Sequence, residues 1–137
     1  MADRDKTEIL NQGAGALPQT NTDDAITRIA GRGDQKVGHL TIIDGPGKGA
    51  ALPVFQGQND ISRSDTARIQ LNFGDLTVSR STPVLLECDP KQKLFVLRDN
   101  GHTNPVTVNG TRLAGAKELA DGDRIAIGKT TLRFTVV

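Results

Sequence analysis

From Val37 to the C-terminus the chain alternates between apolar and polar residues in short runs. In GHLTIID, residues 38–44, and in TLRFTVV, residues 131–137, apolar residues recur at every second position. This period of two is typical of β-strands with one buried face. KLFVLR, residues 93–98, is apolar at successive positions, which is typical of a strand covered on both faces. No run after residue 37 has helical periodicity, so the pattern predicts an all-β domain.

Residues that favour tight turns separate these runs. Asn109 and Gly110 lie between two short runs in VNGTRL, and this pair readily adopts the positive φ angles of a type I′ hairpin turn. Gly122 lies between two aspartates directly before the apolar run that contains Ile125 and Ile127. Many short strands joined by tight turns in about 100 residues are typical of a β-sandwich.

Residues 1–36 have a different composition. They contain no Phe, Val, Trp or Tyr and carry much of the Asn, Gln, Asp and Thr of the chain. Such a segment has little apolar surface to offset the entropy that is lost on ordering. DDAITRIAG, residues 23–31, has the signals of one or two helical turns, which is too short for a stable isolated helix. We therefore predict a flexible polar tail over residues 1–36 and a folded domain over residues 37–137.

Charge and composition argue against several classes of partner. The 137-residue chain has 17 basic and 16 acidic residues, so it has no broad field that would attract nucleic acid or an anionic membrane. It has four Phe and no Trp or Tyr on which bases could stack. Cys88 is the single cysteine, no apolar run reaches about 18 residues, and the N-terminus has no signal-peptide pattern. The expectation is a cytoplasmic protein that binds neither nucleic acid nor membrane.

The motifs of catalysis and of cofactor binding are missing from the sequence. In DGPGKGAAL, residues 44–52, the Lys is followed by Gly rather than by the Ser or Thr that a phosphate-binding P-loop requires. The aspartates of ADGDR, residues 120–124, lack the spacing of a calcium loop. His39 and His102 have no Cys or His partner at metal-ligand spacing, and no serine lies in a nucleophile-elbow context. We therefore predict no enzymatic activity, no cofactor and no metal.

Three polar clusters interrupt the strand pattern, each directly after an apolar run. In a β-sandwich the loops gather at two ends, where recognition residues lie on a rigid scaffold. If the three clusters share one end, their guanidinium, hydroxyl and amide groups face a common space that suits a phosphate, because guanidinium groups bind phosphate oxygens in pairs. For each residue taken singly, the alternative is a solvated loop side chain. The candidate residues are Arg63, Ser79, Arg80, Thr103 and Asn104.

Four segments, in this order and spacing, resemble the forkhead-associated (FHA) domain, a β-sandwich module that binds phosphothreonine peptides. GPGKGAALPVFQGQNDISRS is similar to the opening that leads to the family's Ile-Gly-Arg, and VSRST stands in place of its Ser-Arg-x-His. DNGHTNPVTVNGTRL is in register with Asp-x-Gly-Ser-x-Asn-Gly-Thr-x-Val-Asn-Gly. ELADGDRIAIGKTTLRF follows the ending Leu-x-x-Gly-Asp-x-Ile-x-Ile-Gly. The resemblance runs from about Gly38 to Val137 and implies an FHA-type β-sandwich of about eleven short strands.

The resemblance implies a signalling adaptor that binds a phosphothreonine-containing protein or peptide in a Ser/Thr protein kinase pathway. Arg63 and Ser79 would bind the phosphate oxygens, and Arg80 would add a second cationic contact. Thr103 would donate a further hydroxyl hydrogen bond, and Asn104 would hold the peptide backbone next to the phosphothreonine. Phosphothreonine brings about −1.5 to −2 charges and three acceptor oxygens, so an unphosphorylated peptide loses most of the binding energy.

The sequence departs from the family pattern around the candidate pocket. Ser62 replaces the Gly before the first arginine, and Thr82 replaces a His that braces the binding loops. His102 replaces a loop Ser, and Pro105 replaces the Gly that follows the asparagine. Altered support around a binding site commonly lowers its affinity. The alternative is therefore a degenerate FHA module that mediates a phosphate-independent protein–protein interaction in a larger assembly.

The tail contains two candidate phosphosites. Thr20 and Thr22 lie next to acidic residues in LPQTNTDDAI, residues 17–26. Some small FHA proteins carry a tail threonine that binds in their own pocket after phosphorylation, so the resemblance implies self-binding of this tail as one use of these threonines. A tethered ligand has an effective concentration of the order of mM, so even weak binding would close the pocket. The alternative is a solvated linker.

Overall fold

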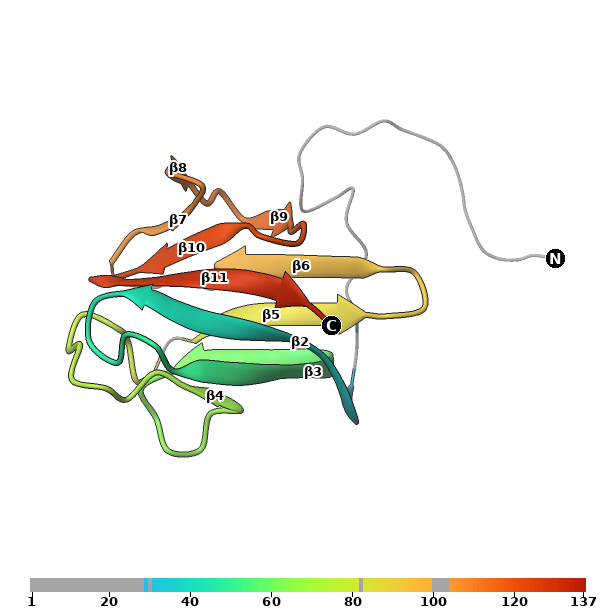
Figure 1. The fold of residues 1–137 in the computed structure, drawn as a ribbon, viewed down its shortest axis with the longest axis horizontal. Helices are drawn as coiled ribbons and strands as arrows, with labels where there is room; N and C mark the ends of the chain where they lie inside the picture. The colour runs from blue at the N-terminus through green and yellow to red at the C-terminus, as the bar shows by residue number, and fades with distance from the viewer. Residues whose placement is uncertain (1–28, 30, 82, 100–103) are drawn as a thin grey trace, which may run out of the picture.

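The structure, a computed structural model, describes residues 29, 31–81, 83–99 and 104–137. These residues form ten strands joined by turns, with no helix among them, so the all-β prediction is confirmed for this part of the chain (Figure 1). Hence no described helix could span a membrane. The strands are β2 (Arg32–Asp44), β3 (Ala51–Ser62), β4 (Ile69–Gln70), β5 (Val84–Asp89), β6 (Leu94–Asp99), β7 (Val106–Val108), β8 (Thr111–Arg112), β9 (Ala116–Glu118), β10 (Arg124–Ile127) and β11 (Thr130–Val136).

Nine of the strands form one continuous sheet in the order β8-β7-β10-β11-β2-β3-β5-β6-β9, and β4 pairs with β3. All neighbours are antiparallel except β3 and β4. The sheet curls onto itself: Phe134 of β11 packs on Phe95 of β6 with ring centroids 5.3 Å apart, although three strands separate β11 from β6. The two halves of the sheet therefore enclose one core, as in a β-sandwich.

The core confirms the period-two pattern of the sequence. Leu40 and Ile42 of β2 and Leu132 and Phe134 of β11 are fully buried, whereas the residues between them lie on the outer face. Because β11 pairs with β2 in this register, all four side chains enter the same layer of the core.

Strand β6 is buried on both faces, as its unbroken apolar run predicts. Four successive residues, Phe95 to Arg98, are buried. On the outer face, Arg98 forms an ion pair with Glu87 of β5, with 2.9 Å between Nε and Oε1, and both side chains are buried. The backbone N–H of Ile29 donates to the same carboxylate at 3.4 Å. The chain just before β2 therefore covers this outer face. The division of the chain at residue 36 stays a prediction, because residues 1–28 lie outside the described part.

Candidate functional site

Arg63 links the end of β3 to the loop that carries Ser79. Its backbone N–H donates to the Ser79 carbonyl at 3.1 Å, and its side-chain Nε donates to the Val78 carbonyl at 2.5 Å. Val78 is buried in the core, so the loop that receives these hydrogen bonds is fixed. The terminal nitrogens of the half-buried Arg63 side chain make no hydrogen bond or ion pair with the described residues. The guanidinium group is thus held through Nε while both Nη atoms keep their donors.

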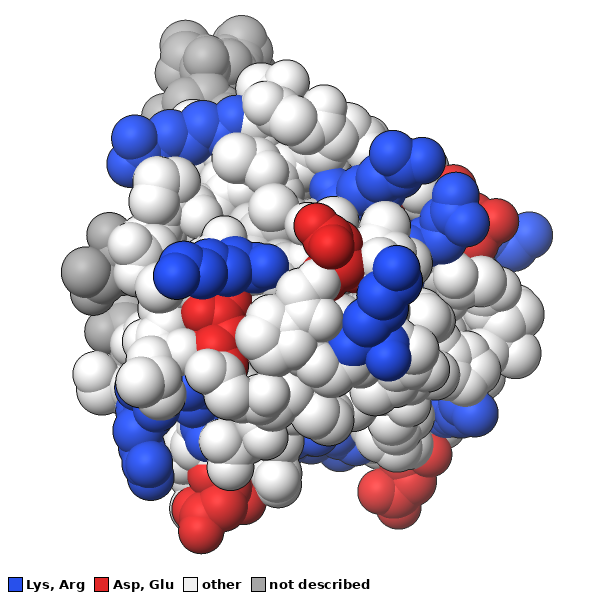
Figure 2. Space-filling view, turned by 60° about the vertical axis from the view of Figure 1, so that its left-hand side comes forward, with Lys and Arg blue, Asp and Glu red and all other residues white. Residues whose placement is uncertain are grey.

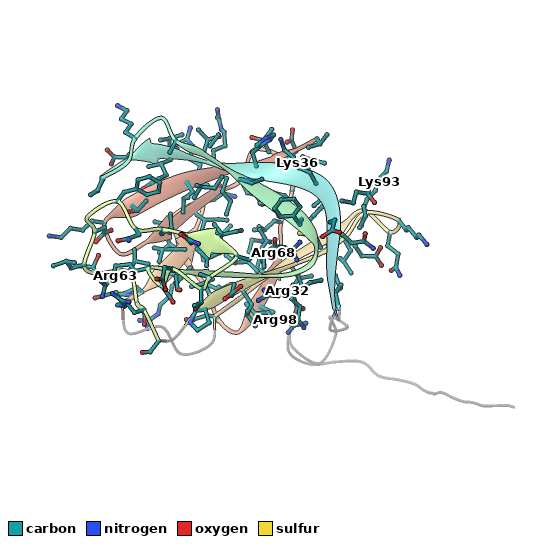
Figure 3. The ribbon with its side chains drawn as sticks, turned by 90° about the horizontal axis from the view of Figure 1, so that it is seen from below. Arg32, Lys36, Arg63, Arg68, Lys93 and Arg98 are labelled. Atoms are coloured by element: carbon teal, nitrogen blue, oxygen red, sulfur yellow. The ribbon has the colours of Figure 1, made fainter. Side chains whose placement is uncertain are left out.

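Asn104 joins the same loop from a third part of the chain. Its Nδ2 donates to the Thr77 carbonyl at 2.9 Å, across 27 positions of sequence. The structure therefore brings Arg63, Ser79 and Asn104 together at one end of the sandwich, around the backbone of residues 77–79. Figure 3 shows Arg63 at the end of the molecule opposite Lys93.

Of the other two candidate pocket residues, the structure describes only Arg80. Arg80 is exposed and makes no hydrogen bond or ion pair with the described residues. Thr103 lies outside the described residues, as do Thr82 and His102. The tail threonines, Thr20 and Thr22, also lie outside them.

Asp75 is a buried residue that supports this loop through hydrogen bonds, and no motif in the sequence predicted that role. The side chain is 4% exposed, and its carboxylate accepts four hydrogen bonds. Two come from the backbone N–H and the hydroxyl of Thr77. The others come from the Lys129 N–H and the Thr130 hydroxyl, both at 2.8 Å. Asp75 therefore ties the loop to the turn between β10 and β11.

The hydrogen bonds keep the Asp75 carboxylate ionised. Burial by itself raises the pKa of Asp75, but the hydrogen bonds from Thr77, Thr130 and Lys129 outweigh it and lower the pKa below the ordinary value of 3.8. The signal in the sequence was an Asp two residues before a Thr, since Asp accepts from the backbone N–H two positions later in an Asx-turn.

Gly128 permits the close approach of the β10–β11 turn to the loop. Its φ is 59°, in the left-handed region, and an added Cβ would overlap the Thr77 side chain. Glycine is therefore required here both for the backbone conformation and for the contact.

Two departures from the family pattern, Ser62 and Pro105, lie within the described residues. The Ser62 side chain is 2% exposed, and its Oγ accepts the Ser64 N–H at 3.1 Å, so the additional atoms are buried and serve the turn after β3. Pro105 is exposed and adjoins Asn104, whose side chain still reaches Thr77. Both substitutions are therefore compatible with the convergence of the three loops.

The charge at this end is local rather than part of a broad field. Figure 2 shows basic and acidic side chains interspersed over the visible surface, consistent with a net charge of +1. Two large apolar side chains are exposed in the segment leading to Ser79: Leu76 at 77% and Phe73 at 41%. Within the described residues, no group of three or more His, Cys, Asp or Glu is arranged to hold a metal ion.

Comparison with known proteins agrees with this architecture. The FHA domain family model matches residues 59–128. A structure from a study of phosphothreonine-dependent FHA domain interactions is 29% identical, with a TM-score of 0.62 over 72% of this chain and 95% of the other. The FhaA FHA domain complexed with the intracellular domain of Rv3910 is 30% identical, with a TM-score of 0.60 over 71% of this chain and 98% of the other.

A third similar structure is Mycobacterium tuberculosis EmbR in complex with a low-affinity phosphopeptide. It is 26% identical, with a TM-score of 0.62 over 74% of this chain and 25% of EmbR. No curated protein sequence matches the chain. The family match, together with the fold and the order of its loops, shows that this chain belongs to the FHA domain family.

Proposed function

We propose that the protein is a non-catalytic signalling adaptor that binds phosphothreonine peptides downstream of Ser/Thr protein kinases in the cytoplasm. The observation that carries the proposal is the convergence of Arg63, Ser79 and Asn104 around residues 77–79 at one end of the sandwich. Related structures were studied for phosphothreonine-dependent interactions or in complex with a phosphopeptide, which supports the same ligand class here.

The geometry explains how such a pocket would favour a phosphate. The Nε hydrogen bond to Val78 fixes the Arg63 guanidinium before any ligand arrives, so binding loses less side-chain entropy. Both Nη atoms then bind phosphate oxygens, with Ser79 and Thr103 as hydroxyl donors and the exposed Arg80 as a second cation. Asn104, held beside the loop by Thr77, contacts the peptide backbone and fixes its register.

Direct binding tests this proposal. A phosphothreonine peptide library is titrated against wild type, with the dephosphorylated and phosphoserine versions of the selected peptide as controls. Arg63→Lys keeps the positive charge but removes the planar guanidinium group, whereas Arg63→Ala removes both. Lys93→Ala, at the opposite end of the molecule, is the matched control. We expect a phosphate-dependent affinity that falls at least tenfold in Arg63→Ala, because hydrogen bonds to a charged group contribute about 1.5–3 kcal/mol. Equal binding of the phosphorylated and dephosphorylated peptides rejects the proposal.

A second candidate function is a phosphate-independent protein contact at the same end. The exposed apolar side chains of Leu76 and Phe73 favour it, because they offer contact area that does not depend on phosphate. A partner that stays bound after phosphatase treatment and to Arg63→Ala, but is lost with Leu76→Ser, supports this function. Release by either of the first two treatments rejects it.

Self-binding of the tail would regulate the proposed pocket. Phosphorylated Thr20 or Thr22 would compete with partners at an effective concentration of the order of mM. Thr20→Ala and Thr22→Ala should then remove kinase labelling of the tail and keep the pocket open after kinase treatment. Unchanged labelling and unchanged peptide affinity in both variants reject self-binding.

A further inference from the structure

Two arginines lie directly opposite each other on the outer face of the sheet. Arg124 of β10 is the cross-strand partner of Arg133 of β11, and both are exposed. The next cross-strand neighbour, Thr41 of β2, is uncharged. Directly opposed residues of an antiparallel pair have Cβ atoms about 4.5–5.5 Å apart, and like charges in this position are destabilising. The fold therefore holds two positive charges together at a cost in stability.

No carboxylate in the described chain neutralises this pair. Neither guanidinium forms an ion pair or hydrogen bond with the described residues. The two aspartates of the turn before β10 are engaged elsewhere. Asp123 accepts from the Asn109 side chain at 3.0 Å and from the Ala120 N–H at 2.8 Å, and Asp121 accepts from the Val136 N–H at 2.7 Å.

A shallow hollow of about 480 Å³ is lined in part by Arg124 of this pair. Two threonines and Arg124 are among its lining residues and no Asp or Glu is, so its composition suits an anion. Its lining residues are Thr107, Asn109, Gly110, Arg124, Ala126 and Thr131.

The arginine pair also lies near the loop end, which is the end of the sandwich where Arg63, Asn104 and residues 77–79 meet. Thr130, at the start of β11, donates to Asp75 beneath the Ser79 loop. Arg133 is three residues farther along the strand, which corresponds to about 10 Å at 3.3–3.4 Å per residue. An extended peptide held at the loop end would cover this distance with about three residues. In Figure 1, β10 and β11 lie side by side and run in opposite directions.

We propose that the outer face at Arg124 and Arg133 is a second contact site, which binds an acidic, carboxylate-bearing segment of the partner that presents its phosphothreonine to the loop end. This inference rests on the proposed function. It adds recognition of carboxylates that lie several residues from the phosphothreonine and that the loop-end pocket does not contact.

The test uses three synthetic peptides and four proteins. The core peptide has seven residues with a central phosphothreonine and uncharged flanks. Two extended peptides add Gly-Ser and four Glu on its N-terminal or its C-terminal side. The proteins are wild type, Arg124→Thr with Arg133→Thr, Arg124→Lys with Arg133→Lys, and the charge-matched control Lys91→Thr with Lys117→Thr. Affinities are measured at 50 and 200 mM NaCl, and amide chemical shifts of the complexes are recorded by NMR.

We expect one extended peptide to bind wild type roughly 2-fold to 30-fold more tightly than the core peptide at low salt, as expected for two exposed ion pairs. The gain should vanish in the double threonine variant, persist in the lysine variant and in the control, and shrink at 200 mM NaCl. Amide shifts at Arg124 and Arg133 should respond to the extension alone. The melting temperature of the double threonine variant should equal or exceed that of wild type, because the repulsion is removed.

The outcomes separate this inference from the proposed function. If the core peptide binds and neither extension adds affinity, or if the gain survives in the double threonine variant, the second site is refuted and the proposed function stands. If the core peptide does not bind, the proposed function fails. The second site is then supported only if unphosphorylated extended peptide at mM concentration shifts the amide resonances of Arg124 and Arg133, and it is refuted if it does not. A lower melting temperature of the double threonine variant would show that the pair serves the fold, which overturns the inference.

Discussion

Replacing Asp75 with Asn removes one charge and leaves the side chain nearly unchanged in volume. The variant therefore tests whether the carboxylate holds the Ser79 loop against the β10–β11 turn. In wild type this carboxylate accepts from the N–H and hydroxyl of Thr77, from the Lys129 N–H and from the Thr130 hydroxyl. An amide has only one oxygen, so it cannot accept from both sides at once.

The expected loss is about 3 kcal/mol. Hydrogen bonds to a charged group contribute about 1.5–3 kcal/mol each, and those between neutral groups about 0.5–1.5 kcal/mol. If the amide oxygen keeps the two bonds from Thr77, each weakens by about 1 kcal/mol. The new NH₂ group then faces the Lys129 N–H, which loses its carboxylate acceptor at a cost of about 1 kcal/mol but keeps a hydrogen bond to the Thr77 hydroxyl oxygen at 3.1 Å, while the Thr130 hydroxyl can rotate to accept. Because these bonds share one acceptor group they are not additive, and about 3 kcal/mol is the reasonable total.

The loss should depend on pH. Since the pKa of folded Asp75 lies below its ordinary value of 3.8, ionisation of this carboxyl contributes stability that is fully present above that value. The contribution is lost as the pH falls through the folded-state pKa. Asparagine does not titrate, so the difference in unfolding free energy between wild type and Asp75→Asn should be constant from pH 7 to about pH 5 and should shrink below pH 3.8.

Urea unfolding followed by circular dichroism measures both effects, since the chain has no Trp or Tyr for intrinsic fluorescence. Asp89→Asn is the matched control, because Asp89 accepts backbone N–H groups of Lys91 and Gln92 in an exposed turn at 3.0 and 3.4 Å. We expect the control to change stability by less than about 0.5 kcal/mol. If Asp75→Asn costs no more than Asp89→Asn, or if its cost does not shrink at low pH, the supporting role of the carboxylate is wrong.

Three further variants probe other parts of the structure. Gly128→Ala should destabilise by about 1–3 kcal/mol more than Gly110→Ala in urea unfolding, because only at Gly128 does the added Cβ meet another side chain, that of Thr77; equal costs would contradict this contact. Arg98→Met should cost about 3–5 kcal/mol by removing the guanidinium partner of the buried Glu87 carboxylate, and adding Glu87→Leu should recover most of it; a double variant as unstable as the single one would argue against loss of this ion pair as the cause. Burial, with the nearby Glu87 carboxylate, raises the pKa of Cys88 to about 12, so a thiol reagent at pH 8 should label the protein in urea but not the native state; rapid native labelling would show that this strand opens.

The parts of the fold that follow from local chemistry were predictable from the sequence. Alternation of apolar residues predicted the buried faces of β2 and β11, because side chains of a strand point to opposite faces at successive positions. Asn109 and Gly110 have φ angles of 52° and 84°, and Val108 pairs with Thr111 across them, which confirms the predicted hairpin turn. In these places a few residues that are adjacent in sequence determine the local structure.

The support of the site was not predictable in the same way. Asp75 meets Thr130 across 55 positions of sequence, and Asn104 meets Thr77 across 27, so the partners depend on how the sheet closes. The ion pair between Glu87 and Arg98 was hidden for a related reason. Charged residues in a strand normally indicate a solvated face, but here the chain at Ile29 covers that face and donates to Glu87.

The hydrogen bonds around Thr77 show why altered neighbours do not by themselves abolish the candidate pocket. Its carbonyl accepts from Asn104, and its N–H and hydroxyl donate to Asp75, which is itself tied to the β10–β11 turn. The next two carbonyls along the loop accept from Arg63. Each of these hydrogen bonds holds one of residues 77–79, so the position of Ser79 depends on several contacts from different parts of the chain. The loop geometry should therefore tolerate the buried Ser62 and the exposed Pro105, whereas loss of the Asp75 carboxylate removes the group that joins Thr77 to Thr130 of the β10–β11 turn.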